Sequence, residues 1–210
     1  MKEAVKGICI LGAGGHGSVV ADIAELCGYS PIEFVDARWP GQRENLAWQV
    51  VGRSFENGSQ SFERFVALGT NGLRLKLVQE MIAAGQVLPT LVHPLASVSK
   101  HAKLGVGCVV MAGAVVNAGA LLGHGVIVNT AASVDHDCVI GDGVHVSPGA
   151  HLGGNVEVGA ESWIGLGASV REGIRIGTRC MVAAGAVVIT HLENGVRVQG
   201  VPARVVAGAD

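Results

Sequence analysis

The chain has 210 residues, a formal net charge of −2, and Lys and Arg residues that are scattered rather than clustered. Nonspecific binding of nucleic acid needs a basic face, so this distribution argues against a nucleic-acid partner. The five cysteines are an odd set without a CxxC pair, and three of them are expected to be reduced core thiols, which predicts a cytoplasmic protein.

The amino-terminal stretch predicts a strand, a glycine turn and a helix, without a signal peptide. The apolar run Gly7–Leu11 leads into Gly-Ala-Gly-Gly-His-Gly at positions 12–17. Residues 18–26 then place apolar side chains on one helical face: Val19, Val20, Ile23 and Leu26. Glycines 12, 14 and 17 fit the G-x-G-x-x-G fingerprint, which turns backbone N–H groups toward a phosphate. A glycine turn that only packs the helix onto the strand is the alternative.

A second strand, Ile32–Val35, ends at Asp36, where the fingerprint expects an acid that holds a ribose hydroxyl. Residues 39–61 are expected to form a variable loop or a short helix. A third strand, Phe65–Leu68, leads through Gly69-Thr70-Asn71-Gly72 into a helix with apolar residues on one side: Leu73, Leu77, Val78 and Met81.

Val87–Val92 is expected to close this unit as its last strand. Residues 1–92 are therefore predicted to be an α/β, Rossmann-like half domain. Half of a dinucleotide-binding fold is large enough for one mononucleotide-sized ligand rather than NAD. Aromatic residues support the division, because only Trp163 lies in the later part of the chain, beyond residue 65.

From Val98 to Val188 an aliphatic residue returns at every sixth position, with a small or β-branched residue two places before it. A strict period of six predicts a hexapeptide β-helix, in which three hexads form a coil and residues 18 apart stack at the strand spacing of about 4.8 Å. Residues 93–190 are assigned to this solenoid, and residues 191–210 to a turn and a capping tail. Its corners are assigned to glycines: Gly105, Gly141, Gly159 and Gly177.

Three cysteines, Cys108, Cys138 and Cys180, fall at the small inward position and are expected to be packed. The stretch between Lys103 and Asp135 lacks formal charges and has the hydropathy of a membrane span. Its polar residues and unbroken period favour a solenoid core, so we expect no membrane span.

One hexad differs from the others, Asp135-His136-Asp137-Cys138-Val139-Ile140. His136 falls at a turn position, where an adjacent carboxylate could fix its tautomer and make it a general base. Gly154, 18 residues later, should stack on His136 and could offer its N–H to an oxyanion. The alternatives are a surface histidine and an ordinary corner glycine. His145 should point outward half a coil away, so the two histidines can converge only between subunits, as in a cyclic trimer.

The combined motifs resemble the bacterial sialic acid O-acetyltransferase/nucleotide-sugar N-acetyltransferase family, within the left-handed hexapeptide-repeat acyltransferases. The motifs that carry the resemblance extend from Gly12–Gly17 to Gly200–Ala203, and they include Gly69-Thr70-Asn71, His93-Pro94, Asn129-Thr130, His136-Asp137 and His145–Ala150. The left hand of the solenoid comes from this resemblance alone, because crossovers between parallel strands are normally right-handed.

The resemblance implies a homotrimer that takes acetyl-CoA and a nucleotide-linked amino sugar, without a metal. It implies His136 as the base, Asp137 as its partner and Gly154 as the oxyanion donor. Several members have Glu in place of Asp137, so Asp135 is a rival partner. The implied acetyl-CoA contacts are Asn129, His145, Gly154, Gly167 and Ala184. The implied nucleotide-sugar contacts are Gly14, Gly15, His16, Gly17, Asp36, Ala37, Arg38, Gly69 and Asn71.

The leading functional hypothesis is acetyl transfer to the 4-amino group of a UDP-linked 4-amino-4,6-dideoxy sugar of the bacillosamine type. The alternatives with the same fold are a GDP-perosamine N-acetyltransferase and a sialic acid O-acetyltransferase. A zinc hydratase of the γ-carbonic anhydrase type is more distant, because His145 and His151 are six residues apart where that family's ligands are five apart. A noncatalytic binding protein is the last alternative.

Overall fold

The computed structural model describes residues 6–206, which divide into a unit that ends at Pro94 and a unit that begins at Leu95. The first unit is α/β and the second is a left-handed parallel β-helix, so the predicted fold class is confirmed. The ends of the predicted first domain and of the predicted tail, residues 1–5 and 207–210, lie outside the described residues.

The N-terminal unit is built on a sheet with the strand order β3-β4-β2-β1-β5. Its strands are β1 (Ile8–Leu11), β2 (Ile32–Val35), β3 (Glu44–Asn45), β4 (Trp48–Gly52) and β5 (Glu63–Val66). Strand β1 pairs in parallel with both β2 and β5, whereas β3 and β4 are antiparallel. The first two strands match the prediction, and β5 begins and ends two residues earlier than predicted. The prediction of a loop or short helix over 39–61 is wrong, because residues 48–51 supply the aromatic and β-branched side chains that favour a strand.

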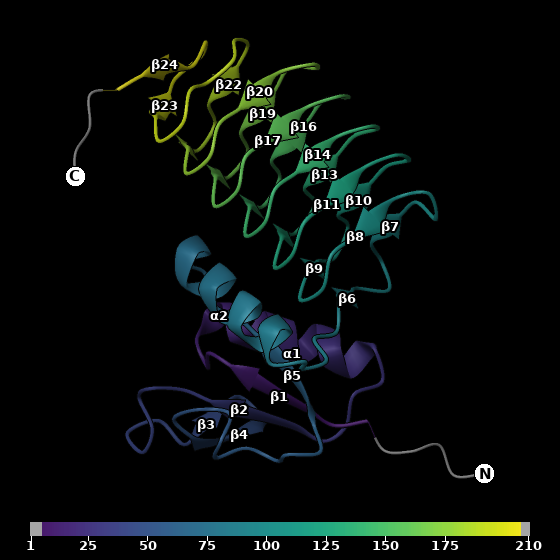
Figure 1. Cartoon of the computed structure of the whole chain (residues 1–210), viewed down its shortest axis with the longest axis vertical. Helices are drawn as coiled ribbons and strands as arrows, with labels where there is room; N and C mark the ends of the chain where they lie inside the picture. Colours follow the sequence, from purple (N-terminus) through teal and green to yellow (C-terminus); the bar gives the residue numbers. More distant parts are fainter. Residues whose placement is uncertain (1–5, 207–210) are drawn as a thin grey trace. The chain divides into compact units, whose positions relative to one another are not determined.

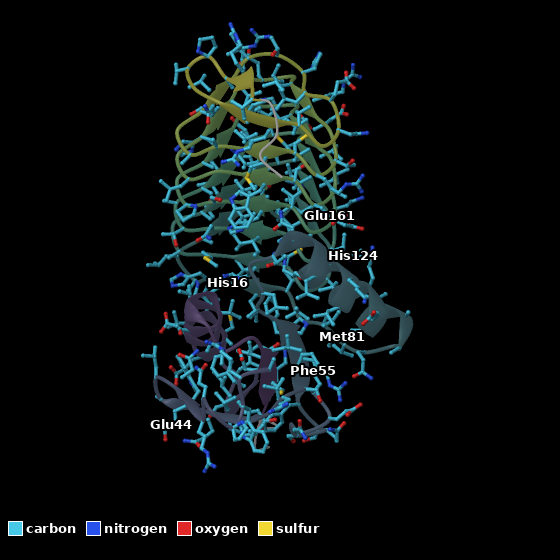
Figure 2. The ribbon with its side chains drawn as sticks, turned by 90° about the vertical axis from the view of Figure 1, so that its left-hand side faces the viewer. His16, Glu44, Phe55, Met81, His124 and Glu161 are labelled. Carbon is cyan, nitrogen blue, oxygen red and sulfur yellow. The ribbon has the colours of Figure 1, made fainter. Side chains whose placement is uncertain are left out.

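Helices α1 (Gly15–Leu26) and α2 (Asn71–Ala83) lie on the same face of this sheet (Figure 1). Both helices exist where they were predicted, but their buried faces differ from the prediction. On α1, Leu26 is 53% exposed, and on α2, Leu73 is 49% exposed. The buried face of α2 contains Arg74 instead. Val66, Val78, Met81 and Leu88 form a cluster with the partly buried Phe55, and Figure 2 labels Met81 and Phe55.

The predicted strand Val87–Val92 is shorter and belongs to another sheet. Only β6 (Leu91–Val92) is extended, and it lies at the end of the longest sheet of the solenoid. Leu91 is the apolar residue that is buried there. The sheet of the N-terminal unit therefore ends at β5, and the chain starts its solenoid strands immediately before His93-Pro94.

The solenoid stacks its short strands into three parallel sheets, and the teal to yellow part of Figure 1 shows successive coils side by side. The sheet that we call face B contains β6, β9 (Val109–Val110), β12 (Ile127–Val128), β15 (His145–Val146), β18 (Trp163–Ile164) and β21 (Met181–Val182), followed by β23 and β24. Face C contains β7 (Ser97–Val98), β10 (Val115–Val116), β13 (Ser133–Val134), β16 (His151–Leu152), β19 (Ser169–Val170) and β22 (Val187–Val188). Face D contains β8 (Lys103–Leu104), β11 (Leu121–Leu122), β14 (Val139–Ile140), β17 (Glu157–Val158) and β20 (Arg175–Ile176).

The register confirms the predicted coil of 18 residues. Val116, for example, pairs with Val98 in one direction and with Val134 in the other. The inward cysteines are packed as expected, and the Cys138 thiol donates a hydrogen bond to the Gly153 carbonyl at 3.2 Å. Burial raises the pKa of Cys138, so this thiol stays protonated and inert.

The turns use glycine for a reason that differs from the prediction. Gly105 and Gly141 lie beside the corners, but the left-handed conformation occurs two positions later, at Gly107 (φ 69°) and Gly143 (φ 65°). What requires glycine at 141 is the next coil, because a Cβ atom there would stand 2.6 Å from the Ala160 nitrogen. Close stacking and the backbone turn are therefore divided between two positions of each repeat.

The C-terminal segment extends the solenoid further than the period suggests. Strand β23 (Arg197–Gln199) pairs in parallel with β21, with Val198 beside Val182 at a spacing of 16 residues instead of 18. Strand β24 (Arg204–Val205) then turns back antiparallel on β23. A coil shortened by two residues hides this continuation from a search for a period of six.

Candidate active site

The unusual hexad forms the turn between β13 and β14, and it brings His136 and Asp137 together as predicted. The Nδ1 atom of His136 lies 2.9 Å from Oδ2 of Asp137, and the two side chains are 57% and 60% exposed. The hydrogen bond to Asp137 raises the pKa of His136, and the nearby charge of Asp135 acts in the same direction. With Nδ1 donating to the carboxylate, Nε2 of the neutral ring carries the lone pair and can accept a proton.

Gly154 lies against the His136 ring, as the period predicts. A Cβ atom on Gly154 would overlap Nε2 and Cε1 of that ring. No acceptor within residues 6–206 receives a hydrogen bond from the Gly154 N–H, whereas the equivalent N–H of Thr178 donates to Asn194 at 2.8 Å. The turn therefore places an available N–H donor beside the proton-accepting atom of His136.

The structure separates the two aspartates that the sequence leaves as rivals. The ring of His136 pairs with Asp137. Oδ1 of Asp135 instead accepts the backbone N–H of His136 at 2.8 Å, and it also accepts the side-chain amide of Asn117 at 2.8 Å. These bonds hold Asp135 against the main chain. Asn117 was not predicted as a partner of Asp135, although the period places it one coil before that residue.

Apart from Gly154, the predicted acetyl-CoA residues lie on face B or along another edge, between faces B and C. Asn129 follows β12, and its amide lies 3.0 Å from Nε2 of His145. His145 was expected to point outward, yet it is 6% exposed, with its ring 4.3 Å from that of Trp163. Gly167 and Ala184 are exposed in later turns of the same edge, and a Cβ atom on Gly167 would meet no atom within 4 Å.

Within one chain, this edge and the His136 turn are at opposite sides of face C. The turn that follows β12 carries Asn129, whereas the turn that follows β13 carries His136. Within one chain, Gly154 therefore lies beside the candidate base, whereas Asn129, Gly167 and Ala184 do not.

Ser147 is a further polar residue near this edge that the sequence analysis did not single out. It follows β15, it is 3% exposed, and its hydroxyl has no hydrogen-bond partner among the described residues. Buried hydroxyl groups usually have a partner, so this one is available to a bound group. A serine beside His145 in an otherwise apolar hexad was the sequence signal.

In the N-terminal unit, the glycine loop contains two kinds of glycine. Gly12 has a φ of 110°, and a Cβ atom on Gly17 would strike the Gly12 carbonyl, so this pair is explained by packing of α1 on β1. A Cβ atom on Gly15 would meet nothing within 4 Å, and one on Gly14 would meet only Arg38, at 3.9 Å. Packing therefore does not explain Gly14 and Gly15, which leave the N-terminus of α1 open to a ligand.

Asp36 ties this loop to Arg38. Its Oδ2 accepts the Ala13 N–H at 2.7 Å, and the Arg38 guanidinium binds both carboxylate oxygens at 2.8 Å. These hydrogen bonds hold the pKa of Asp36 well below its usual range. Ala37, between the two, is exposed. Asp36 therefore fixes the loop and Arg38, and its contact with a ribose hydroxyl stays a prediction.

The second loop of this unit follows β5 and contains Gly69 and Asn71. Asn71 is 7% exposed, and its Oδ1 accepts a hydrogen bond from Arg74 at 2.9 Å. Arg74, which is 1% exposed, also donates to the carbonyls of Leu68 and Gly69. Arg74 was not predicted as a site residue, because an arginine one residue after Leu73 is typical of a solvated helix face.

His16 lies in the first turn of α1 (Figure 2), and its Nε2 atom is buried without a partner among the described residues. Burial lowers the pKa of His16 to about 4, and the charge of Arg74 adds to this effect. His16 is therefore neutral at pH 7. Its Nε2 atom can form a hydrogen bond with a ligand while the ring stays uncharged.

The two loops lie at one edge of the sheet, because β1 and β5 are parallel neighbours. The chain leaves β1 through α1 toward β2, whereas β5 is on the other side of β1. Ligands of open α/β sheets bind at such a switch point, outside the carboxyl ends of the strands. The segments that carry Gly14, His16 and Asn71 therefore border one candidate ligand site.

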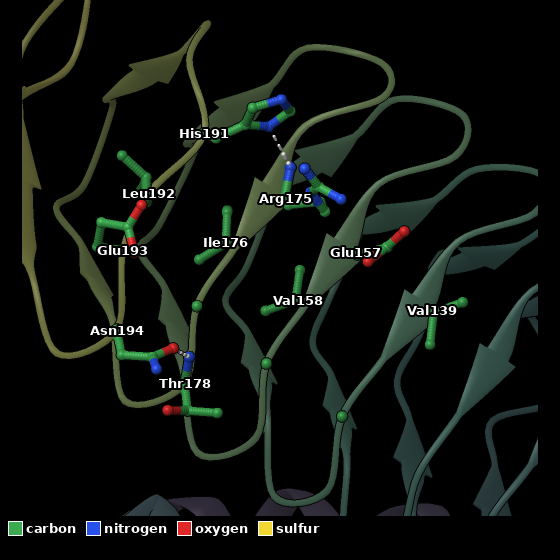
Figure 3. Close-up of a pocket in the computed structure, with 13 residues that line it drawn as sticks. Val139, Glu157, Val158, Arg175, Ile176, Thr178, His191, Leu192, Glu193 and Asn194 are labelled. Atoms are coloured by element: carbon green, nitrogen blue, oxygen red, sulfur yellow. Dashed lines mark hydrogen bonds between the residues drawn. The ribbon is translucent and has the colours of Figure 1, made fainter.

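A separate groove of about 590 Å³ runs along the outside of face D, where residues 191–194 border β14, β17 and β20 (Figure 3). Two hydrogen bonds hold its wall, from Arg175 N to His191 Nδ1 at 3.0 Å and from Thr178 N to Asn194 Oδ1 at 2.8 Å. The residues that line it include none of the predicted site residues.

Within residues 6–206, no group of three or more His, Cys, Asp or Glu side chains is arranged to hold a metal ion. The two histidines of the zinc hypothesis lie on different faces, His145 on β15 and His151 on β16. Neither α1 nor α2, the helices of the described part of the chain, has the length and apolar character needed to cross a bilayer.

Residues 7–81 match the family described as the PglD N-terminal domain. The acetyltransferase domain of PglB from Neisseria gonorrhoeae, solved with acetyl coenzyme A, is 43% identical with a TM-score of 0.92, over 97% of this chain and 100% of that chain. PerB from Caulobacter crescentus, solved with CoA and GDP-perosamine, is 38% identical with a TM-score of 0.89, over 97% and 99%. WeeI from Acinetobacter baumannii is 26% identical with a TM-score of 0.87, over 96% and 100%.

This similarity extends over both units, so the hypothesis of a noncatalytic binding protein is set aside. The chain belongs to the hexapeptide-repeat nucleotide-sugar acetyltransferases.

Proposed function

We propose that the protein transfers the acetyl group of acetyl-CoA to the 4-amino group of a UDP-linked 4-amino-4,6-dideoxy sugar, with His136 as the general base. The observation that carries the proposal is the turn in which Nδ1 of His136 pairs with Asp137 while Gly154 lies against the ring. This is the arrangement that a proton transfer beside a developing oxyanion requires. The cytoplasmic location expected from the sequence is part of the proposal.

In the proposed reaction the amine nitrogen attacks the thioester carbonyl, and Nε2 of His136 takes a proton from that nitrogen. Gly154 N–H donates to the oxygen that becomes negative. The tetrahedral intermediate then breaks its C–S bond, and the leaving thiolate takes a proton from the imidazolium. The products are the amide and CoA, and His136 returns to its neutral form. Asp137 keeps the ring in one tautomer and stabilises its charged form.

The proposed assembly is a homotrimer. The candidate base lies at one side of face C and the edge with Asn129, Gly167 and Ala184 at the other, so one chain does not complete the site. A cyclic assembly could place the His136 turn of one subunit against that edge of the next. Ser147, whose buried hydroxyl has no partner in the described chain, is then positioned to contact acetyl-CoA.

The N-terminal unit is proposed to hold the nucleotide. Its diphosphate would lie at the open N-terminus of α1, beside Gly14 and Gly15, where a positive end of the helix and unshielded N–H groups favour an anion. Arg38 would add a charge that Asp36 orients. His16 and Asn71 would contact the rest of the ligand as neutral hydrogen-bonding groups.

GDP-perosamine is the second candidate acceptor, because PerB was solved with it and is 38% identical to this chain. The test is release of CoA thiol from acetyl-CoA by the purified protein, with UDP-4-amino-4,6-dideoxy-N-acetylglucosamine and GDP-perosamine assayed in parallel. Efficient release with the UDP sugar alone is the expected result. Release with GDP-perosamine alone would show that the acceptor is a GDP sugar instead of a UDP sugar. If neither sugar supports release but sialic acid does when it is assayed as a third acceptor, the reaction is O-acetylation and not N-acetylation.

A further inference from the structure

We propose that Asn117 and Asp135 are positioning residues, which fix the main chain at His136 by hydrogen-bond geometry rather than by the charge of Asp135. The inference rests on the proposed role of His136 as the base. It separates two functions within one hexad, since Asp137 serves the imidazole ring and Asp135 serves the backbone that carries it.

Two hydrogen bonds in sequence link successive coils at this turn. Asn117 is the corner residue of the preceding coil, 18 positions before Asp135. Its Nδ2 donates to Oδ1 of Asp135 at 2.8 Å, and the same oxygen accepts the His136 N–H at 2.8 Å. The donor from Asn117 therefore holds the oxygen on which the His136 backbone depends.

The neighbouring corner shows that an amide can make the same bond. Oδ1 of Asn129 accepts the Thr130 N–H at 2.8 Å, with the same one-residue spacing. Asn129 and Asp135 occupy the same place in their hexads, six residues apart. An uncharged oxygen is therefore sufficient for this turn, and Asp135→Asn should preserve its geometry.

The preceding coil also supports the ring partner. The Asp137 N–H donates to the Ala118 carbonyl at 3.1 Å, and Asp137 adopts a left-handed φ of 59°. A Cβ atom on Gly119 would strike Oδ1 of Asp137. Asn117 and Ala118 thus bond to Asp135 and to the backbone of Asp137, and Gly119 leaves room for the Asp137 carboxylate, so this segment supports the turn that carries His136.

Misplacement of a catalytic group by about 1 Å can cost on the order of a hundredfold in rate, so loss of one of these bonds should reduce kcat measurably. We expect Asn117→Ala and Asp135→Ala to lower kcat by roughly tenfold while each KM changes less than about twofold. Asp135→Asn should keep kcat within about threefold of the parent, because the amide oxygen replaces the carboxylate oxygen.

The matched control is Asn194→Ala. Asn194 makes a turn hydrogen bond of the same length, 2.8 Å to Thr178 N, in the last coils of the solenoid. Its loss should leave kcat unchanged. Thermal unfolding of all variants separates a general loss of stability from an effect on the turn.

A spectroscopic measurement tests the positioning without relying on turnover. In protein labelled with ¹⁵N at its histidines, the His136 amide proton should move upfield in Asp135→Ala and stay near its place in Asp135→Asn. Equal losses of kcat in Asp135→Asn and Asp135→Ala would overturn the proposal in favour of a charge effect. An unchanged kcat in Asn117→Ala would also overturn it. If the amide shifts as expected but His136→Ala retains activity, the positioning stands and the proposed base is wrong.

Discussion

The solenoid and the N-terminal unit place functional residues in different ways. In the solenoid the backbone repeats, and the candidate site differs from the other coils only in the side chains at fixed positions of the repeat. Asp137, for example, stands at a turn position that is glycine in many other coils. In the N-terminal unit the candidate residues lie in three unlike segments, which follow β1, β2 and β5. The first region can be read by counting residues, whereas the second depends on loop geometry that no period describes.

The difference also predicts how substitutions act. A residue in the solenoid contacts the residue 18 positions away, so a substitution there should act on the residues stacked above and below it. A glycine in the N-terminal loop is required either by the packing of α1 or by a ligand, and only the surrounding atoms tell which.

After loss of His136 itself, the largest effect is expected for Gly154→Ala, which tests the stacking rule. The added methyl would displace the His136 ring, so kcat should fall by about 10²-fold or more. The measurement is a double-mutant cycle on kcat with His136→Ala. In the His136→Ala background the methyl has no ring to displace, so Gly154→Ala should cost little more. Additive losses would contradict the stacking account.

Two substitutions in the glycine loop separate packing from binding. Gly17→Ala should lower the free energy of unfolding by about 1–3 kcal/mol, because its methyl meets the Gly12 carbonyl. Gly15→Ala has open space, so it should keep the stability of the fold and raise KM for the nucleotide sugar by roughly tenfold, since the methyl would stand between the N–H groups and a phosphate. Urea unfolding and steady-state kinetics test both. An unchanged KM in Gly15→Ala would remove this loop from the ligand site.

The pH dependence of catalysis should move when the ring partner changes. Asp137 raises the pKa of His136, so the ring stays protonated, and inactive as a base, to a higher pH than an unperturbed histidine would. Asp137→Asn should therefore shift the acidic limb of kcat/KM to lower pH, even though it lowers the maximal rate. The profile is measured between pH 5 and 9. A limb that shifts to higher pH would show that Asp137 acts otherwise.

The smallest effect concerns His16 and the stability of the N-terminal unit. Its pKa is about 4 in the folded chain against an ordinary value of 6.5, so between these values the unfolded chain binds a proton that the folded chain does not. Stability should fall as the pH drops from 6.5 toward 4. Between pH 7 and pH 5 the parent should lose roughly 1–2 kcal/mol more than His16→Gln. The comparison uses urea unfolding, with His101→Gln as the control. Equal losses in His16→Gln and the parent would mean that His16 is not buried as a neutral group.

The sequence predicted the solenoid closely, because its period dictates which residues stack. It located His136 in a turn and Gly154 beside it, and it left Asp135 and Asp137 as rivals, since both flank the histidine. Only side-chain geometry separates them. Oδ2 of Asp137 lies 2.9 Å from Nδ1 of the His136 ring, whereas Oδ1 of Asp135 lies 2.8 Å from the His136 backbone nitrogen. It missed the last coil, because two residues are absent from that repeat.

The N-terminal unit was less predictable for a physical reason. Helical periodicity placed Leu73 on the inner face of α2, but the interior there accommodates the charged Arg74, whose donors are satisfied by loop carbonyls and Asn71. A buried cation in a helix follows from hydrogen-bonding demand and not from hydrophobicity. The burial of His145 was also not predictable from periodicity, because its place in the hexad does not show that the Trp163 ring lies against it.

The central claim is that His136 is the base for acetyl transfer, and the most direct test is kcat of His136→Ala at saturating acetyl-CoA and acceptor. We expect a loss of about 10²–10⁴-fold, partly restored by added imidazole because the site is open to solvent, whereas His101→Ala keeps the parent rate. A loss below about threefold would contradict the role of His136 and, with it, the account of the turn that holds it.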